Sequence, residues 1–143
     1  MARTVEQFMS PHPVVVDAAK VVSDCARLMD DREIGALGVT QDGRLVGVLT
    51  DRDIVIRAIA RGRDPQTTVA GDVASTAPIT VARDASLDDA AKLMGRHGVR
   101  RLFVVDEESR PTGILTADDL AALRDPTSVA AHAIRDWGLG SYT

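Results

Sequence analysis

The sequence predicts an α+β fold made of two copies of one β-α-β-β-α unit, and an internal repeat is the main reason. Matching residues lie 65 positions apart in three blocks, as in Pro13 and Pro78, Met29 and Met94, and Leu37 and Leu102. In a fourth block, residues 47–54 match residues 113–120 at a spacing of 66. Four blocks in one order at nearly one spacing indicate a duplication. The second reason is that β-branched runs alternate with segments of helical period in both copies.

Each element follows from a local pattern. The short β-branched runs at residues 14–16 and 79–81 predict strands. Apolar residues at helical spacing predict helices over residues 21–32 and from residue 87 to at least 94. Two further strands, at residues 37–40 and 45–50, flank Asp42-Gly43, a strong hairpin signal. A last helix should run from Asp51 to about Arg61 and stop at Gly62. Its counterpart should begin near Ala117 and end before Pro126.

These elements divide the chain into repeats at residues 5–62 and 69–123, a linker at 63–68 and a tail at 124–143 that could hold a short helix. A repeat of about 60 residues buries too little surface to be stable by itself. We therefore expect the repeats to pack face to face about a pseudo-twofold axis. That arrangement creates two related clefts, and small ligands commonly bind in such clefts.

Composition excludes several classes of protein. The 143 residues are 45% hydrophobic and 27% charged, which is typical of a soluble globular protein. A net charge of −4 and an aromatic content of 3% argue against nucleic-acid binding. No apolar run reaches the ~20 residues of a membrane span, and no signal peptide precedes the repeats. A single cysteine, Cys25, cannot form an intramolecular disulfide, so we expect a cytoplasmic protein.

The motif Gly-aliphatic-aliphatic-Thr-x-x-Asp closes both repeats, ending at Asp53 and at Asp119. Repeated in register, it resembles the CBS-domain pair, or Bateman module, over residues 5–123. The resemblance implies a regulatory module, not an enzyme, that requires no cofactor. It implies an adenosyl ligand, namely AMP, ADP, ATP or S-adenosylmethionine, and output through a protein partner or the module's own oligomer. It also places residues 5–9 near the first strand.

The resemblance assigns ligand residues to two clefts, each combining the Thr and Asp of one repeat with strand starts of the other. The first cleft comprises Thr50, Asp53, Ile79, Thr80, Val99, Arg100 and Arg101. The second cleft comprises Thr116, Asp119, Val14, Val15, Ile34, Gly35 and Ala36. An Asp can accept hydrogen bonds from both ribose hydroxyls. The alternative is structural, because Thr-x-x-Asp before a helix also fits a capping box; the two roles are compatible.

The clefts differ in charge. Arg100 and Arg101 lie at the first cleft, where the matching residues of the second are Gly35 and Ala36. We expect a phosphorylated nucleotide to bind at the first cleft, since phosphate recognition favours a cation. A solvated basic surface is the alternative interpretation of these arginines.

Other candidate chemistry is weaker. Asp51 and Asp53 could bind a divalent metal, but the second repeat has Ala117 at the first of these positions. His12, His97 and His132 lack ligand spacing for zinc, and Cys25 fits a core position. Trp137 in the tail could pack on the core or contact a partner.

The resemblance also implies a homodimer. The helical stripes Val22-Ala26-Met29 and Leu87-Ala91-Met94 are the predicted interface. A ligand-silent, dimerising scaffold or stress-associated interaction protein is the alternative function.

Overall fold

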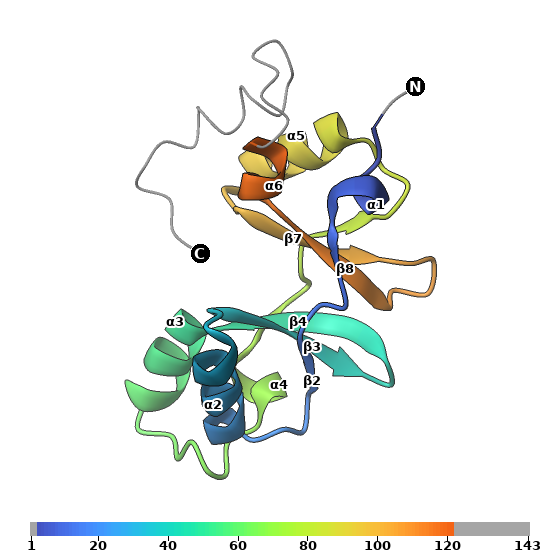
Figure 1. The fold of residues 1–143 in the computed structure, drawn as a ribbon. Helices are drawn as coiled ribbons and strands as arrows, with labels where there is room; N and C mark the ends of the chain where they lie inside the picture. The colour runs from blue at the N-terminus through green and yellow to red at the C-terminus, as the bar shows by residue number, and fades with distance from the viewer. Residues whose placement is uncertain (1–2, 122–143) are drawn as a thin grey trace. The chain divides into compact units, whose positions relative to one another are not determined.

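The structure is a computed structural model that describes residues 3–121. The chain forms two compact units: one is Val14–Pro78, and the other combines residues 3–13 with residues 79–121. Each unit contains a four-stranded sheet and its helices (Figure 1). The predicted α+β class and the duplication are confirmed, because the two sheets have the same strand topology. The predicted tail helix and Trp137 lie outside the described residues.

The unit Val14–Pro78 has the sheet order β2-β3-β4-β5. Its strands are β2 (Val15–Asp17), β3 (Ala36–Gln41), β4 (Arg44–Thr50) and β5 (Ser75–Thr76). Its helices are α2 (Val22–Arg32), α3 (Asp51–Asp53), the π-helix η1 (Ile54–Ile59) and α4 (Ala70–Val73). β2 and β3 are parallel, and the other pairs are antiparallel. The predicted hairpin is present: Asp42 and Gly43 both have positive φ, 55° and 79°, as its tight turn requires.

The other unit has the sheet order β1-β8-β7-β6. Its strands are β1 (Ser10–Pro11), β6 (Thr80–Ala82), β7 (Arg101–Val105) and β8 (Pro111–Thr116). Its helices are α1 (Val5–Phe8), α5 (Leu87–His97) and α6 (Ala117–Ala121). The β7–β8 turn has no Asp-Gly. Instead, Oδ1 of Asp106 accepts hydrogen bonds from the amides of Glu108 and Arg110, both at 2.9 Å, and these bonds shape the longer turn.

The N-terminal segment completes the sheet of the second repeat. β1 pairs with β8, and the Val5 amide donates to the Ala85 carbonyl at 2.9 Å. Val5 is fully buried in the same core as Leu115. The prediction that residues 5–9 pack near the first strand is therefore wrong. The segment covers apolar side chains and an edge of β8 that the second repeat leaves open.

In the same way, a segment from the second repeat completes the sheet of the first repeat. α4 and β5, which begin the second repeat in sequence, complete the sheet of the first unit through β4–β5 pairing. Val73 and Ala74 are buried in that core. Each repeat thus supplies the outermost antiparallel strand of the other repeat's sheet. The spacing of 65 extends to these segments, since Ser10 in β1 corresponds to Ser75 in β5.

The helical stripes predicted as a dimer interface lie mainly in the cores. Val22 and Met29 on α2 pack in the first core. Leu87, Ala91 and Met94 on α5 pack in the second. The prediction of this interface is wrong, because the sheet of each unit already covers these side chains. Ala26 alone among the stripe residues is exposed.

The last helix of the first repeat differs from the regular α-helix predicted over Asp51 to Arg61. After one short α-helical segment it widens into η1, where the Ala60 amide donates to the carbonyl of Val55 five residues earlier, at 2.8 Å. The helix ends at Ile59, two residues before the predicted end at Arg61, and Gly62, with a positive φ of 73°, lies in the turn that follows. Within residues 3–121, no helix combines the length and apolarity that a membrane crossing would need.

Candidate functional site

Thr50 and Asp53 lie where β4 ends and α3 begins. The Asp53 amide donates to Thr50 Oγ1 at 3.1 Å, and the Thr50 amide donates to Asp53 Oδ2 at 2.9 Å. This is a complete capping box, with Thr50 at the N-cap. The structural role foreseen for the pair is confirmed.

Thr116 and Asp119 repeat this geometry at the junction of β8 and α6. The corresponding distances are 3.2 Å and 2.9 Å. The reciprocal bonds hold each carboxylate in one orientation. Because a carboxylate has about four lone-pair sites, capping leaves acceptors for other donors. Capping and ligand binding are chemically compatible at both positions.

Each capping box lies beside the start of its own repeat's second strand. Ala36 pairs with Thr50, and the Asp51 amide donates to the Gly35 carbonyl at 3.0 Å. In the other unit Arg101 pairs with Thr116, and the Ala117 amide donates to the Arg100 carbonyl at 2.8 Å. Gly35 and Arg100 are therefore structurally equivalent positions. The predicted clefts combine these parts across the repeats, and that combination stays a prediction.

The other predicted ligand residues lie at strand starts. Val14 precedes β2, Val15 begins it, and Ile34 precedes β3 and packs partly on the first core. Ile79 precedes β6, Thr80 begins it, and Val99 precedes β7. Ile79 and Val99 both pack partly on the second core. Because β2 and β3 are parallel, and β6 and β7 are parallel, these strand starts lie at one end of the sheet within each unit.

The equivalent positions differ in charge, as the sequence indicated. Asp51 Oδ2 would lie 3.2 Å from a Cβ added at Gly35. A hollow of about 440 Å³ beside them is also lined by Asp30 and Glu33. In the other unit Arg100 Nη2 lies 3.9 Å from Asp118 Oδ1, and Ala117 has no charge. One strand start is therefore flanked by carboxylates, and the other carries an arginine that lies beside the exposed carboxylate of Asp118.

Arg57 is a site neighbour that sequence reasoning missed. Its Nε lies 3.9 Å from Asp53 Oδ1, and its Nη1 lies 3.4 Å from the carbonyl oxygens of both Val73 and Ala74. It joins η1 to the segment that completes the sheet. Its position four residues after Asp53 on a predicted helix could have indicated this ion pair. The matching residue in the second repeat is Leu123, so this feature is not repeated in sequence.

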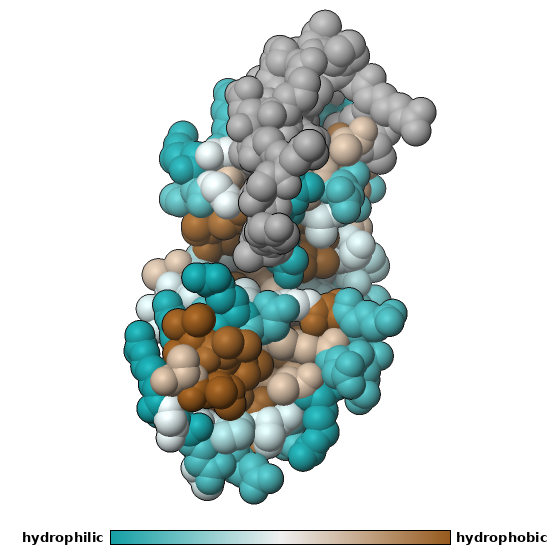
Figure 2. All heavy atoms as spheres, turned by 90° about the vertical axis from the view of Figure 1, so that its left-hand side faces the viewer, coloured by the Kyte–Doolittle hydropathy of each residue, from teal (hydrophilic) through white to brown (hydrophobic). Residues whose placement is uncertain are grey.

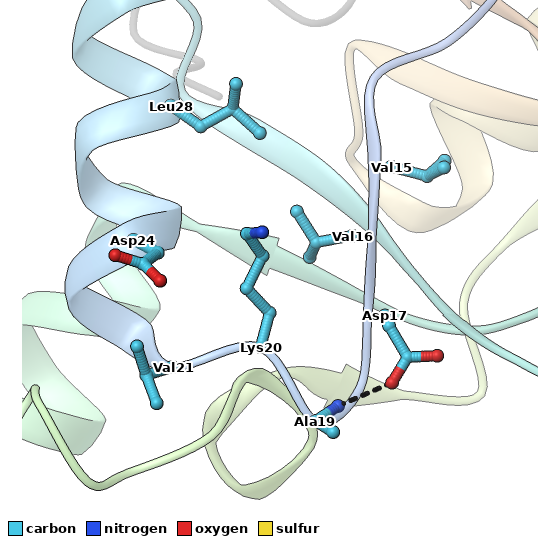
Figure 3. Close-up of a pocket in the computed structure, with 8 residues that line it drawn as sticks. All are labelled: Val15, Val16, Asp17, Ala19, Lys20, Val21, Asp24 and Leu28. Atoms are coloured by element: carbon cyan, nitrogen blue, oxygen red, sulfur yellow. Dashed lines mark hydrogen bonds between the residues drawn. The ribbon is translucent and has the colours of Figure 1, made fainter.

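A larger hollow, of about 560 Å³, lies between β2 and α2 (Figure 3). Lys20 is flanked there by Asp17 and Asp24, and of the predicted residues only Val15 lines it. Asp17 Oδ2 accepts from the Ala19 amide at 2.9 Å, and Asp24 pairs with Arg27 at 2.9 Å. Both carboxylates thus have partners within the protein.

Cys25 is buried on α2, and burial raises the pKa of its thiol. This confirms its predicted core position. Residues 3–121 contain no group of three or more His, Cys, Asp or Glu side chains placed to hold a metal ion. Asp51 Oδ1 accepts from the Arg52 amide at 2.8 Å, whereas Asp53 caps the helix.

The strand–capping box–helix junction is present in both units, at Thr50–Asp53 and at Thr116–Asp119. The CBS-domain family model matches residues 5–59 and 70–125, so the chain belongs to the CBS-domain family as a tandem pair. Among curated relatives, the CBS domain-containing protein YhcV of Bacillus subtilis is 37% identical over 131 residues, 92% of each chain. Hypoxic response protein 1 of Mycobacterium tuberculosis is 38% identical over 119 residues, 82% of each chain.

Solved structures agree. The crystal structure of Hypoxic Response Protein I with two coordinated zinc ions superposes with a TM-score of 0.76 at 38% identity, covering 83% of this chain and 97% of that one. CBSX2, an Arabidopsis thaliana protein, in complex with AMP gives a TM-score of 0.73 at 32% identity. The matched regions cover 85% of this chain and 97% of CBSX2.

Proposed function

We propose that this protein is a regulatory module that binds an adenosyl ligand through the two sets of residues assigned to the first and second clefts. The AMP complex of CBSX2, at 32% identity over most of both chains, is the observation that carries the proposal. YhcV matches over nearly its whole length as a CBS-domain protein, which supports regulation and not catalysis. Output would pass to a protein partner or through the module's own oligomer.

The geometry supports a role for the two motif carboxylates in holding ribose. Asp53 is fixed by its capping bonds, yet its side chain keeps 13% exposure. Such a preoriented carboxylate suits two vicinal hydroxyl donors, because bonds to a charged acceptor are the stronger ones. Asp119 has the same geometry.

Within this proposal, phosphorylated nucleotides bind first at the set that contains Thr50, Asp53 and Arg101. That set carries both arginines of the pair, whereas the second set has Gly35 and Ala36. Arg101→Ala should weaken AMP far more than adenosine, and high salt should shrink the difference as screening reduces the charge interaction. Equal losses for adenosine and AMP would refute a phosphate role for Arg101.

Calorimetric titration with AMP tests the proposal at Asp53. Asp53→Ala should cost about 1.5–3 kcal/mol of binding free energy, the scale of a hydrogen bond to a charged group. Asp53→Asn should cost less, and Asp119→Ala, the matched control, should leave the tighter site almost unchanged. If Asp53 serves only as a cap, folded Asp53→Ala protein would bind AMP as the wild type does and only its melting temperature would fall.

A second candidate function, a dimerising interaction scaffold, is favoured by a hydrophobic surface on η1. Val55, Ile56 and Ile59 are 55%, 43% and 53% exposed. Figure 2 faces the side of the first unit that carries this helix and displays a hydrophobic patch there. Clustered exposed apolar residues commonly mark interaction sites. We infer that η1, in place of the stripes on α2 and α5, contributes to a homodimer contact.

Light scattering at micromolar concentration tests the dimer. The wild type should give about twice the 15.2 kDa chain mass, and Ile59→Lys should shift the protein toward monomer. Arg61→Glu, an exposed charge change near the end of the helix, is the control for a general charge effect. A wild-type mass of one chain would refute the dimer.

A further inference from the structure

The two repeats carry different residues at two pairs of equivalent backbone positions. Gly35 accepts the amide hydrogen of Asp51, and Arg100 accepts that of Ala117, at 3.0 and 2.8 Å. The first repeat thus pairs a residue without a side chain with a carboxylate. The second pairs an arginine with a methyl group. The backbone hydrogen bond is the same in both repeats, whereas the charged residue of the pair is an aspartate in the first and an arginine, 3.9 Å from Asp118 Oδ1, in the second.

Within each pair, the residue at one position limits which residue fits at the other. A Cβ at position 35 would lie only 3.2 Å from Asp51 Oδ2, which is tighter than ordinary contact. A side chain at 35 is therefore accommodated more easily when the carboxylate at 51 is absent. The second repeat has this combination, with Arg100 beside the small Ala117. The two positions should therefore be substituted together.

Two further acidic residues lie beside Gly35 and Asp51. Asp30 and Glu33 line the same hollow of about 440 Å³ as Gly35 and Asp51. All three carboxylate residues are exposed, so screening moderates their repulsion of an anion without removing it. A phosphate group placed here would meet like charge, and a neutral or cationic group would not.

Resting on the proposed adenosyl-binding function, we infer that the Gly35–Asp51 and Arg100–Ala117 pairs determine which ligand each set of residues accepts. The set containing Arg100 selects phosphorylated nucleotides. The set containing Gly35 selects adenosyl ligands without a phosphate group, neutral or cationic. One chain would then respond to two classes of adenosyl compound through its two diverged repeats.

Exchange variants test this specificity by calorimetric titration with AMP, adenosine and S-adenosylmethionine. Gly35→Arg/Asp51→Ala, placed in the Asp53→Ala background to weaken the first set, should raise AMP affinity on the order of tenfold or more, the scale of one added charged hydrogen bond. Affinity for S-adenosylmethionine should fall. The reciprocal Arg100→Gly/Ala117→Asp variant, in the wild-type background, should lose a similar factor for AMP and little for adenosine.

Gln41→Arg/Asp31→Ala in the same background is the matched control, because it makes the same charge changes at exposed residues that do not line the hollow. Circular dichroism and melting curves establish that each variant is folded. AMP binding unchanged in both exchange variants, or raised equally by the control, would overturn the inference while leaving the proposed function intact. If the wild type bound none of the three ligands, both the inference and the proposed function would be overturned.

Discussion

The glycine of the repeated motif has a structural role that can be tested at Gly47. β5 pairs with β4 at this residue, and a Cβ added there would lie 2.7 Å from the Ser75 carbonyl oxygen and 3.4 Å from Ala74 Cβ. The nearer atom belongs to the backbone, so no side-chain rotation relieves the overlap. Gly47→Ala must therefore push β5 away from β4 and loosen the core packing of the adjoining Val73 and Ala74.

The magnitude follows from two opposing effects. Overpacking costs about 1–3 kcal/mol, and the lower entropy of alanine in the unfolded chain returns about 0.4–1 kcal/mol. We expect a net loss of about 1–2 kcal/mol in the free energy of unfolding, measured by urea denaturation. Hydrogen exchange should also be faster at the β4–β5 pairing than at β2–β3. A Gly47→Ala protein within about 0.5 kcal/mol of the wild type, the range of ordinary surface changes, would refute the reasoning.

Four other predictions follow from the same contacts. Gly113→Ala should destabilise the other unit, because its Cβ would meet Met9 Sδ and lie 2.9 Å from the Ser10 carbonyl oxygen; Met9→Ala in the same chain should recover part of the loss, and no recovery would count against the Met9 contact. The amides of Arg110 and Glu108 hold the pKa of Asp106 below its usual value, so its ionised form stabilises the fold. That contribution is present above the carboxyl's unfolded pKa and is lost as pH falls through the lower folded value; the stability gap between wild type and Asp106→Asn should close across this acid range, and a gap independent of pH would contradict the turn assignment. Cys25, buried and with a raised thiol pKa, should react with a thiol reagent only on unfolding; rapid native-state labelling would refute its core position. Glu33, the C-cap of α2 with φ 54°, occupies the position that Gly98 occupies after α5, so Glu33→Gly should raise the melting temperature, whereas a fall would show that local contacts of Glu33 outweigh its backbone strain.

Local patterns predicted most of the fold because the signals act over a few residues. The Asp42-Gly43 hairpin, the helix from Val22 and the turn at Gly62 each depend on neighbours in sequence. The capping boxes were foreseen for the same reason, since Thr50 and Asp53 are three residues apart.

Nonlocal features were missed or wrongly placed. β1 pairs with β8, about one hundred residues later in the chain, and nothing local in Ser10-Pro11 indicates that partner. The stripe on α2 has the same helical spacing whether it faces a core or a second copy of the chain. In the structure, Val22 and Met29 of this stripe lie in the core. Arg57 was missed because its contacts with Val73 and Ala74 depend on where α4 and β5 pack.

The duplication kept the scaffold and changed the charge. Residues that hold the backbone in place are matched in both repeats: the capping box, the glycine next to the completing strand and the completing segment itself. The residues that determine the local charge differ, because Arg100, Ala117 and Leu123 stand in the second repeat at the positions of Gly35, Asp51 and Arg57. Backbone geometry constrains the first group, because a change there disturbs a whole sheet. The second group lies at strand starts and on exposed helix faces, where substitution changes the local charge at little cost to stability. The two repeats can therefore differ in local charge while each still completes the other's sheet, and under the proposed function that difference changes which ligand each set of residues accepts.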